Sequence, residues 1–306
     1  MNILIAGGSG LIGQAFIQSL LAHGHQVSVL TRTPERVRLP GNAEAVAWDG
    51  KTTQGWGQRV ETADAIVNLA GENIGDLPWT NARKDRIRTS RVMVGQALVD
   101  AVQASTRRPR VLMQSSAVGY YGTHRSEPLN EQSGPGSDYM ASVAMDWEAS
   151  TLPVEAVGVR RIVIRSGIVL TPSGGALSRF LWAWRAYLGG PMGSGKQWYS
   201  WIHMRDQVEA MRFLLENEAA SGVYNLTSPE PVTNETFGRT LADVLGRPFW
   251  LPVPGFGLRL LLGEMSTMVL DGQRVLPERL LALGYPFAFR SLKPALEDLL
   301  KSSGTP

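Results

Sequence analysis

The sequence predicts an α/β protein with a doubly wound parallel sheet and a smaller C-terminal lobe. Two observations support this prediction. Short apolar runs alternate with stretches of helical periodicity as far as residue 165, and a glycine-rich turn joins the first apolar run to the first helical stretch. After Gly167 the pattern changes to loops rich in glycine and proline. We therefore divide the chain into a sheet domain, residues 1–166, and a substrate lobe with a C-terminal helical segment, residues 167–306, which can return strands to the main sheet.

The apolar runs predict six parallel strands, at residues 3–5, 27–30, 43–48, 65–69, 110–114 and 160–165. Helical patterns lie between them. Right-handed crossovers place such helices on both faces of the sheet and bring the carboxyl ends of the strands to one edge. We expect the functional site at that edge.

The glycine-rich turn directly follows the first strand and reads Gly7-Gly8-Ser9-Gly10-Leu11-Ile12-Gly13. In the helical pattern that comes next, Ile12, Phe16 and Leu20 share one face. Glycines let the backbone turn tightly and approach a pyrophosphate, whose charge is stabilised by the free N–H groups of the following helix. The order of strand, glycines and helix predicts a dinucleotide site. The alternative is an ordinary tight turn between a strand and a helix.

The end of the second strand indicates which dinucleotide binds. The strand ends at Thr31-Arg32, where a ribose with a free 2′-hydroxyl would require Asp or Glu, and the next carboxylate is Glu35. A guanidinium can instead form charge-assisted hydrogen bonds to a 2′-phosphate, and Arg36 and Arg38 can assist. The sequence therefore predicts NADP(H), although arginines after a strand can also be solvated surface residues.

Composition narrows the class of protein. The chain has 306 residues, of which 43% are hydrophobic and 19% charged, as in folded globular proteins. A net charge of +3 makes nucleic acid an unfavourable partner. The absence of cysteine excludes disulfides, thiolate metal sites and a cysteine nucleophile. Because no apolar run is long enough to span a bilayer and no leader precedes the first strand, we expect a cytoplasmic protein without a membrane partner.

A basic segment precedes the fifth strand. Its cations share an amphipathic helix with Ile87, Val94, Leu98 and Val102; they are Arg83, Lys84, Arg86, Arg88 and Arg91. We expect a solvated face, with a clamp for acidic substrate groups or a subunit contact as alternatives. The sequence predicts no metal site, because His23, His25, His124 and His203 lack ligand spacing. A serine hydrolase is also unsupported, because Gly193-Ser194-Gly195 is not framed as a nucleophile elbow.

Three further segments follow the glycine turn in order along the chain. They are Asn68-Leu69-Ala70-Gly71, Ser115-Ser116-Ala117-Val118-Gly119-Tyr120-Tyr121-Gly122 and Trp201-Ile202-His203-Met204-Arg205-Asp206. Together these motifs resemble the extended short-chain dehydrogenase/reductase superfamily, and within it the subgroup labelled epimerase family protein. The resemblance covers essentially the whole chain. It implies a Rossmann fold and an NADP(H)-dependent oxidoreductase or epimerase, and suggests a homodimer paired through the helices at 80–104 and 138–150.

The resemblance also implies a catalytic pair, in which a tyrosine transfers a proton while a lysine four residues later lowers its pKa. Tyr139 matches the tyrosine, but Val143 stands in the place of the lysine, and no lysine occurs between Lys84 and Lys196. The usual mechanism is therefore in doubt. The candidate replacement cations are Arg91, Arg165 and Lys196.

A serine completes the superfamily's catalytic set. Ser116 is the best match, although counting back from Tyr121-Gly122 would place Ala117 there. The predicted cofactor-binding residues outside the glycine turn are Thr31, Arg32, Asp49, Asn68, Leu69, Ala70 and Gly71. The predicted substrate-binding residues are Tyr120, Tyr121, Lys196 and Trp201.

Several of these residues have structural alternatives. Asp49 matches a position that bonds the adenine amino group in many relatives, but it can equally form a turn. Tyr120 and Tyr121 can simply pack, and Asp206 can cap a helix. Two functions remain open. One is an oxidoreductase or epimerase that acts on a small polar substrate, with nucleotide sugars among the candidates; the other is a non-catalytic NADP(H)-binding redox sensor or interaction protein.

Overall fold

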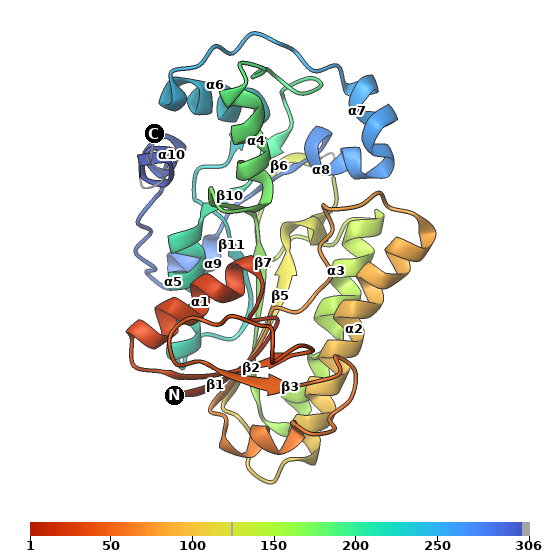
Figure 1. The fold of residues 1–306 in the computed structure, drawn as a ribbon, viewed down its shortest axis with the longest axis vertical. Coiled ribbons are helices and arrows are strands. Elements are labelled where there is room, and N and C mark those ends of the chain that lie inside the picture. Colours follow the sequence, from red (N-terminus) through yellow and green to blue (C-terminus); the bar gives the residue numbers. More distant parts are fainter. Residues whose placement is uncertain (124, 302–306) are drawn as a thin grey trace.

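The main sheet confirms the predicted doubly wound α/β fold. In the computed structural model, which describes residues 1–123 and 125–301, seven parallel strands lie in the order β11-β7-β5-β4-β1-β2-β3 (Figure 1). They are β1 (Asn2–Ala6), β2 (Gln26–Thr31), β3 (Glu44–Ala47), β4 (Ala65–Asn68), β5 (Val111–Ala117), β7 (Arg160–Ser166) and β11 (Gly222–Leu226). The first six correspond to the predicted strands. The seventh comes from the C-terminal half, so the sheet extends beyond the predicted boundary at residue 166.

Helices cover both faces of this sheet (Figure 1). On one face, α1 (Leu11–Ala22) and α5 (Met204–Glu216) pack on Ile3 and Ile5. On the other, α2 (Asn81–Ala104) packs on Leu4 and Ala6 and lies beside α3 (Tyr139–Ala149). Because both faces of the strands are buried, their sequences are continuous apolar runs instead of alternating ones.

A smaller lobe stands beyond the carboxyl ends of the strands (Figure 1). Its core includes Trp201 and Phe237 and joins α4 (Gly175–Arg185), α6 (Asn234–Leu245) and α10 (Leu292–Lys301). Short elements complete the chain: β6 (Arg125–Leu129), β8 (Ile168–Leu170), β9 (Trp198–Tyr199), β10 (Trp201–His203), β12 (Val232–Thr233), α7 (Gly255–Leu262), α8 (Thr267–Leu270), β13 (Gln273–Val275), α9 (Glu278–Ala282), and the 3-10 turns η1 (Gly57–Thr62), η2 (Val118–Tyr121), η3 (Leu152–Val157) and η4 (Gly263–Ser266).

Asp206 joins the C-terminal segment to the sheet domain. The prediction that it caps a helix is wrong, because Nδ1 of His203 caps α5 by accepting the Arg205 N–H. The buried Asp206 carboxylate instead accepts the N–H groups of Ala288 and Phe289, each at 2.8 Å. Burial raises the pKa of this carboxyl, and the hydrogen bonds partly offset that effect.

The basic segment forms α2, which Thr80 caps by accepting the Arg83 N–H. The expectation of a solvated face is wrong for Arg83 and Arg91, whose side chains are buried. Pairing of two chains through α2 and α3 stays a prediction. No helix in the described part of the chain is both long and apolar enough to cross a membrane.

Candidate functional site

The glycine turn packs directly against the loop that follows β4. Gly7 has a φ of +81°, and a Cβ there would lie 2.6 Å from the Leu69 carbonyl carbon and the Ala70 nitrogen. A Cβ at Gly13 would lie 2.7 Å from the Gly7 carbonyl oxygen. Any larger residue would separate the turn from the loop. The structure thus brings together two groups of predicted cofactor residues that are about sixty positions apart in the sequence.

The amino end of α1 is open to an anion. Gly10 is the N-cap, and in the described structure no side chain caps the helix and no acidic residue stands in its first turn. The first N–H groups of a helix lack intrahelical partners and carry partial positive charge. This end of α1 therefore fits a pyrophosphate.

The charged residues that follow β2 and β3 differ in their hydrogen bonds and ion pairs. Arg32 is exposed, and its side chain has no hydrogen bond or ion pair within residues 1–123 and 125–301, whereas Arg36 lies 3.7 Å from Glu35. Asp49 accepts the N–H groups of Lys51 and Thr52. These hydrogen bonds lower the pKa of Asp49, and the bond from the Thr52 N–H has the largest effect. The structure therefore shows the turn that was the alternative for Asp49, and its contact with adenine stays a prediction.

Asn68 fixes the loop after β4. Its fully buried amide donates to Gln114 on β5 at 2.9 Å and accepts the Ala70 N–H at 3.2 Å. The neighbouring strand thereby holds the loop, and Asn68 fixes the position of Leu69, Ala70 and Gly71. The contact of these residues with a cofactor stays a prediction.

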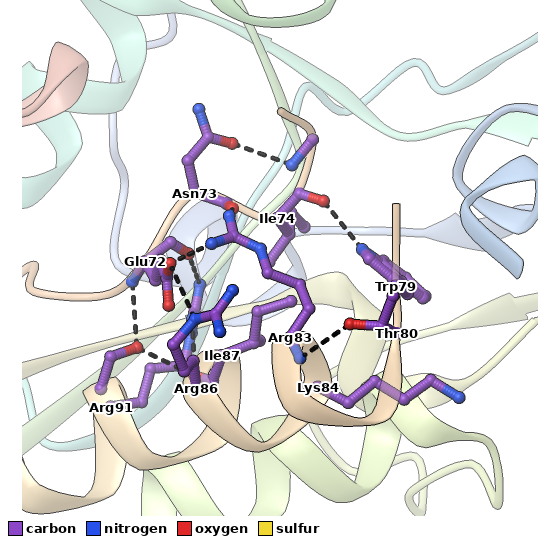
Figure 2. Close-up of polar contacts among 12 residues, drawn as sticks. Glu72, Asn73, Ile74, Trp79, Thr80, Arg83, Lys84, Arg86, Ile87 and Arg91 are labelled. Carbon is purple, nitrogen blue, oxygen red and sulfur yellow. Dashed lines mark hydrogen bonds and ion pairs between the residues drawn. The ribbon is translucent and has the colours of Figure 1, made fainter. Parts of the chain in front are cut away.

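Arg91 supports the same loop from below (Figure 2). Its guanidinium donates to the carbonyls of Glu72 and Ile87 and lies 4.8 Å from the ring centre of Trp147. A Cβ at Gly71 would lie 3.0 Å from Arg91 Cζ. Burial lowers the pKa of Arg91 to about 10. Arg91 is thus a buried cation that holds the cofactor loop.

Glu72 ties this loop to α2. Its carboxylate pairs with Arg83 and lies 3.7 Å from Arg86, and its N–H donates to Ser90 Oγ (Figure 2). Glu72 was not among the residues predicted from the sequence. The sequence signal for it was an acidic residue shortly before the basic segment, which indicates an ion pair with that segment.

Tyr139 lies at the start of α3 and already has a hydrogen-bond partner. Its hydroxyl donates to the Lys84 carbonyl at 2.9 Å, and its ring packs against Trp79. The ammonium of Lys84 lies 5.2 Å from the centre of the Tyr139 ring and pairs with Glu264. Burial raises the pKa of Tyr139, although nearby arginines partly offset this. The positive charge beside Tyr139 therefore comes from α2. The superfamily motif, which places a lysine four residues after the tyrosine, could not predict this.

Ser116 belongs to a different, buried network. Its hydroxyl donates to Glu148 at 2.6 Å, and Arg165 makes two bonds of 2.8 Å to the same carboxylate. Ser116 and Arg165 are each 3% exposed. The structure therefore neither joins Ser116 to Tyr139 nor places Arg165 as the missing lysine. If Ala117, and not Ser116, occupies the position of the superfamily's catalytic serine, this chain has no serine at that position.

Two residues predicted to contact substrate have side chains that are fully buried and hydrogen-bonded within the protein. Tyr121 donates to Asn225 at 2.8 Å, and the Trp201 indole donates to the Glu230 carbonyl at 3.0 Å. Tyr120 is half-buried, with Arg165 3.3 Å from its ring centre. Lys196 is exposed and lines a cavity of about 640 Å³.

The described residues hold no group of three or more His, Cys, Asp or Glu side chains that could bind a metal ion. The predicted absence of a metal site rested partly on His124, which lies outside the described residues.

Comparisons with known proteins agree with this architecture. The model of the NAD dependent epimerase/dehydratase family matches residues 3–227, from the first strand to the last strand of the sheet. The chain belongs to this family. A second model, described as a domain of unknown function (DUF1731), matches residues 253–299.

Similar proteins extend over nearly the whole chain. An epimerase family protein of Staphylococcus aureus (strain MRSA252) is 37% identical over 97% of this chain and 98% of its own length. The chloroplastic homolog of epimerase family protein SDR39U1 from Arabidopsis thaliana is 39% identical over 98% of this chain and 87% of its own length. The crystal structure of human SDR39U1 (isoform 2) with NADPH is 34% identical, with a TM-score of 0.90, and covers 98% of this chain and 99% of that one.

Proposed function

We propose that this family member binds NADP(H) and acts as an oxidoreductase or epimerase on a small polar substrate, with nucleotide sugars among the candidates. The observation that carries the proposal is the glycine turn at the uncapped end of α1 in the described structure. Exposed Arg32 lies at the end of β2. The NADPH in the crystal structure of human SDR39U1 supports the same cofactor.

The residues present fit this cofactor. Gly7 to Gly13 and the amino end of α1 would hold the pyrophosphate, Arg32 the 2′-phosphate, and the loop from Asn68 to Gly71 the ribose beyond. When bound, the nicotinamide supplies or accepts a hydride. In this chain Tyr139 would hold the proton at its phenol oxygen, and the α2 cations Arg88, Arg91 and Lys84 would supply the positive charge that the residue at 143 lacks.

A charge reversal at Arg32 tests the cofactor. Binding of NADPH and NADH is followed by tryptophan fluorescence in the wild type and in Arg32→Asp. We expect the substitution to weaken NADPH binding by at least about tenfold and NADH binding much less, because a charge-assisted bond to the extra phosphate is lost. Arg108→Asp, on the exposed Arg108 side chain before β5, is the matched control. Equal weakening for both nucleotides would remove the 2′-phosphate assignment.

A second candidate function is a non-catalytic NADP(H)-binding sensor or interaction protein. The hydroxyls of Tyr139 and Ser116 are both engaged within the protein, and this observation favours it. Oxidation of NADPH is measured with a panel of carbonyl compounds for the wild type, Tyr139→Phe and Lys84→Met. Turnover that both variants lose while they still bind NADPH supports the enzyme. Tight NADPH binding without turnover on any compound supports the sensor.

A further inference from the structure

A cavity of about 640 Å³ lies between the loop that precedes β9, the helix α7 and the chain that leads into β13. Its walls include Ser194, Lys196, Trp198, Phe256, Arg259 and Leu270. Within the described structure, none of the residues predicted to bind the cofactor lines it. Half of these walls belong to the C-terminal segment that matches a domain of unknown function.

Close backbone approaches create this cavity. A Cβ at Gly193, whose φ is +60°, would lie 2.8 Å from Cδ2 of Leu270 on α8, and a Cβ at Gly272 would lie 2.0 Å from the Trp198 carbonyl oxygen. A Cβ at Gly255, the first residue of α7, would lie 3.6 Å from Gly193 Cα. The glycines thus bring α7 and the chain before β13 onto the loop that leads into β9.

The walls carry two cations, Lys196 and Arg259, one carboxylate, Asp271, and apolar surface, so cations outnumber carboxylates. Neither Lys196 nor Arg259 has an ion-pair partner among residues 1–123 and 125–301, and both are exposed. Arg274 is not among the lining residues in the described structure, but its guanidinium lies 4.9 Å from the ring centre of Trp198. Phe256, Trp198 and Leu270 supply apolar surface between these charges. Such walls complement a molecule that joins an anionic group to a flat or apolar body.

Phe256 is 75% exposed although it lines the cavity. The ring is therefore accessible to a ligand that enters the cavity. The opposite case occurs at Trp201, which is fully buried and packs the lobe's core. The aromatic residues that can touch a ligand are therefore Trp198 and Phe256.

The cavity is connected to the edge of the sheet through β13. Gln273, directly after Gly272, donates through its side-chain amide to the Val118 carbonyl at 2.6 Å. Val118 follows β5 in η2. Ser200, just after β9, donates to the Gln273 carbonyl at 2.8 Å. The walls of the cavity are thus fixed to the part of the sheet where the superfamily resemblance places the reacting groups.

We infer that α7 completes the substrate pocket and selects an anionic ligand with an aromatic or apolar body, held by Arg259 and Lys196 and packed on Phe256 and Trp198. This inference rests on the proposed function, because it names the substrate class of that site. It assigns the C-terminal segment a role in specificity.

Calorimetric titration tests the ligand class with 2-naphthyl phosphate, neutral 2-naphthol and inorganic phosphate, in the presence of saturating NADPH. We expect 2-naphthyl phosphate to bind at least about tenfold more tightly than either of the others, because only this compound can contact both the cationic and the apolar side chains of the cavity. Equal binding of naphthol and naphthyl phosphate, or no binding of either, would overturn the inference. Competition by UDP-glucose identifies the physiological anion as a nucleotide, and its failure to compete identifies a non-nucleotide aromatic anion.

Two pairs of variants locate the ligand. Arg259→Gln and Phe256→Ser should each weaken the binding of 2-naphthyl phosphate by about fivefold or more. The control for Phe256 is Leu260→Ser, on the same helix, 88% exposed and absent from the cavity wall in the described structure. The control for Arg259 is Arg185→Gln, an exposed cation on α4. Losses in the controls as large as those in the cavity variants would contradict the inference.

A separate NADPH titration without naphthyl compounds keeps the two proposals distinguishable. NADPH binding together with failure of the naphthyl titration rejects the substrate class and leaves the proposed cofactor standing. Absence of NADPH binding rejects the proposed function, whatever the cavity binds.

Discussion

The end of the sheet predicted to bind the cofactor and the region predicted to be catalytic, called here the cofactor end and the catalytic end, differ in what fixes them. At the cofactor end, the glycine turn and the end of β2 are set by residues that are neighbours in the sequence. At the catalytic end, Ser116 is engaged by Glu148 on α3, and Tyr139 by Lys84 on α2. The glycine turn can therefore be recognised from adjacent residues, although it also packs on the distant loop after β4, whereas the hydroxyls of Ser116 and Tyr139 are engaged by residues of distant elements. Substitutions at either end should lower stability, but only those at the cofactor end should also remove NADPH affinity.

The largest loss of stability is expected at the catalytic end. Glu148→Ala leaves the buried Arg165 guanidinium without its carboxylate, which should lower the free energy of unfolding by about 4 kcal/mol. Urea unfolding measures the change. Because this network lies away from the glycine turn, the folded variant should bind NADPH as the wild type does.

The control for Glu148 is Glu235→Ala, which removes an exposed ion pair with Arg239 and should cost at most about 0.5 kcal/mol. A similar loss in both variants would show that the buried network is not a special source of stability. A large loss of NADPH affinity in Glu148→Ala would mean that the two ends are not independent.

The next largest effect is expected at the cofactor end. Gly7→Ala combines a φ of +81° with a Cβ only 2.6 Å from the loop after β4, so the free energy of unfolding should fall by about 3 kcal/mol. NADPH binding should be lost in the folded variant, because the turn must move. Both quantities come from urea unfolding and calorimetry of the same preparation.

Gly24→Ala is the matched control for Gly7. Its φ of +77° is nearly the same, but a Cβ there meets nothing within 4 Å, so only about 1 kcal/mol should be lost and NADPH affinity should be retained. If Gly7→Ala behaved like Gly24→Ala, the close approach of the turn and the loop would not be required for binding.

The smallest of the three effects concerns pH and the C-terminal lobe. Burial lowers the pKa of His203 from 6.5 to about 4, so between these values the unfolded chain binds more protons than the folded one. The contribution of His203 to stability is therefore present above pH 6.5 and is lost as the pH falls toward 4. Between pH 7 and pH 5 it should decrease by about 2 kcal/mol.

The measurement is the free energy of unfolding against pH for the wild type, His203→Asn and His23→Gln. His203→Asn should flatten the fall below pH 6.5, and His23→Gln, at an exposed position, should keep it. An unchanged slope in His203→Asn would show that another group causes the acid sensitivity.

The sequence predicted the fold and the position of the glycine turn between β1 and α1 well, for physical reasons. Six strands were found because parallel strands buried on both faces are continuous apolar runs. The turn was found because glycines, strand and helix are adjacent in sequence. Strands returning from the C-terminal segment to the main sheet were allowed for, but β11 was not located because its five residues Gly222–Leu226 include glycine and asparagine and give a weak apolar signal.

The candidate site could be predicted only in part. Trp201 and Tyr121 were expected to contact substrate, but their burial depends on packing between elements far apart in the sequence. Lys84 was not considered as the cation for Tyr139 because the two residues are 55 positions apart and meet only where α2 and α3 pack together. Side chains that meet across elements carry no local pattern, so their pairing has to be observed.

Calorimetric titration of the wild-type protein with NADPH, and with NADH for comparison, tests the central claim most directly. The account predicts saturable binding of NADPH that is at least about tenfold tighter than that of NADH, since Arg32 can pair with the additional phosphate. Absence of binding heat with NADPH, together with an unchanged melting temperature, would contradict it.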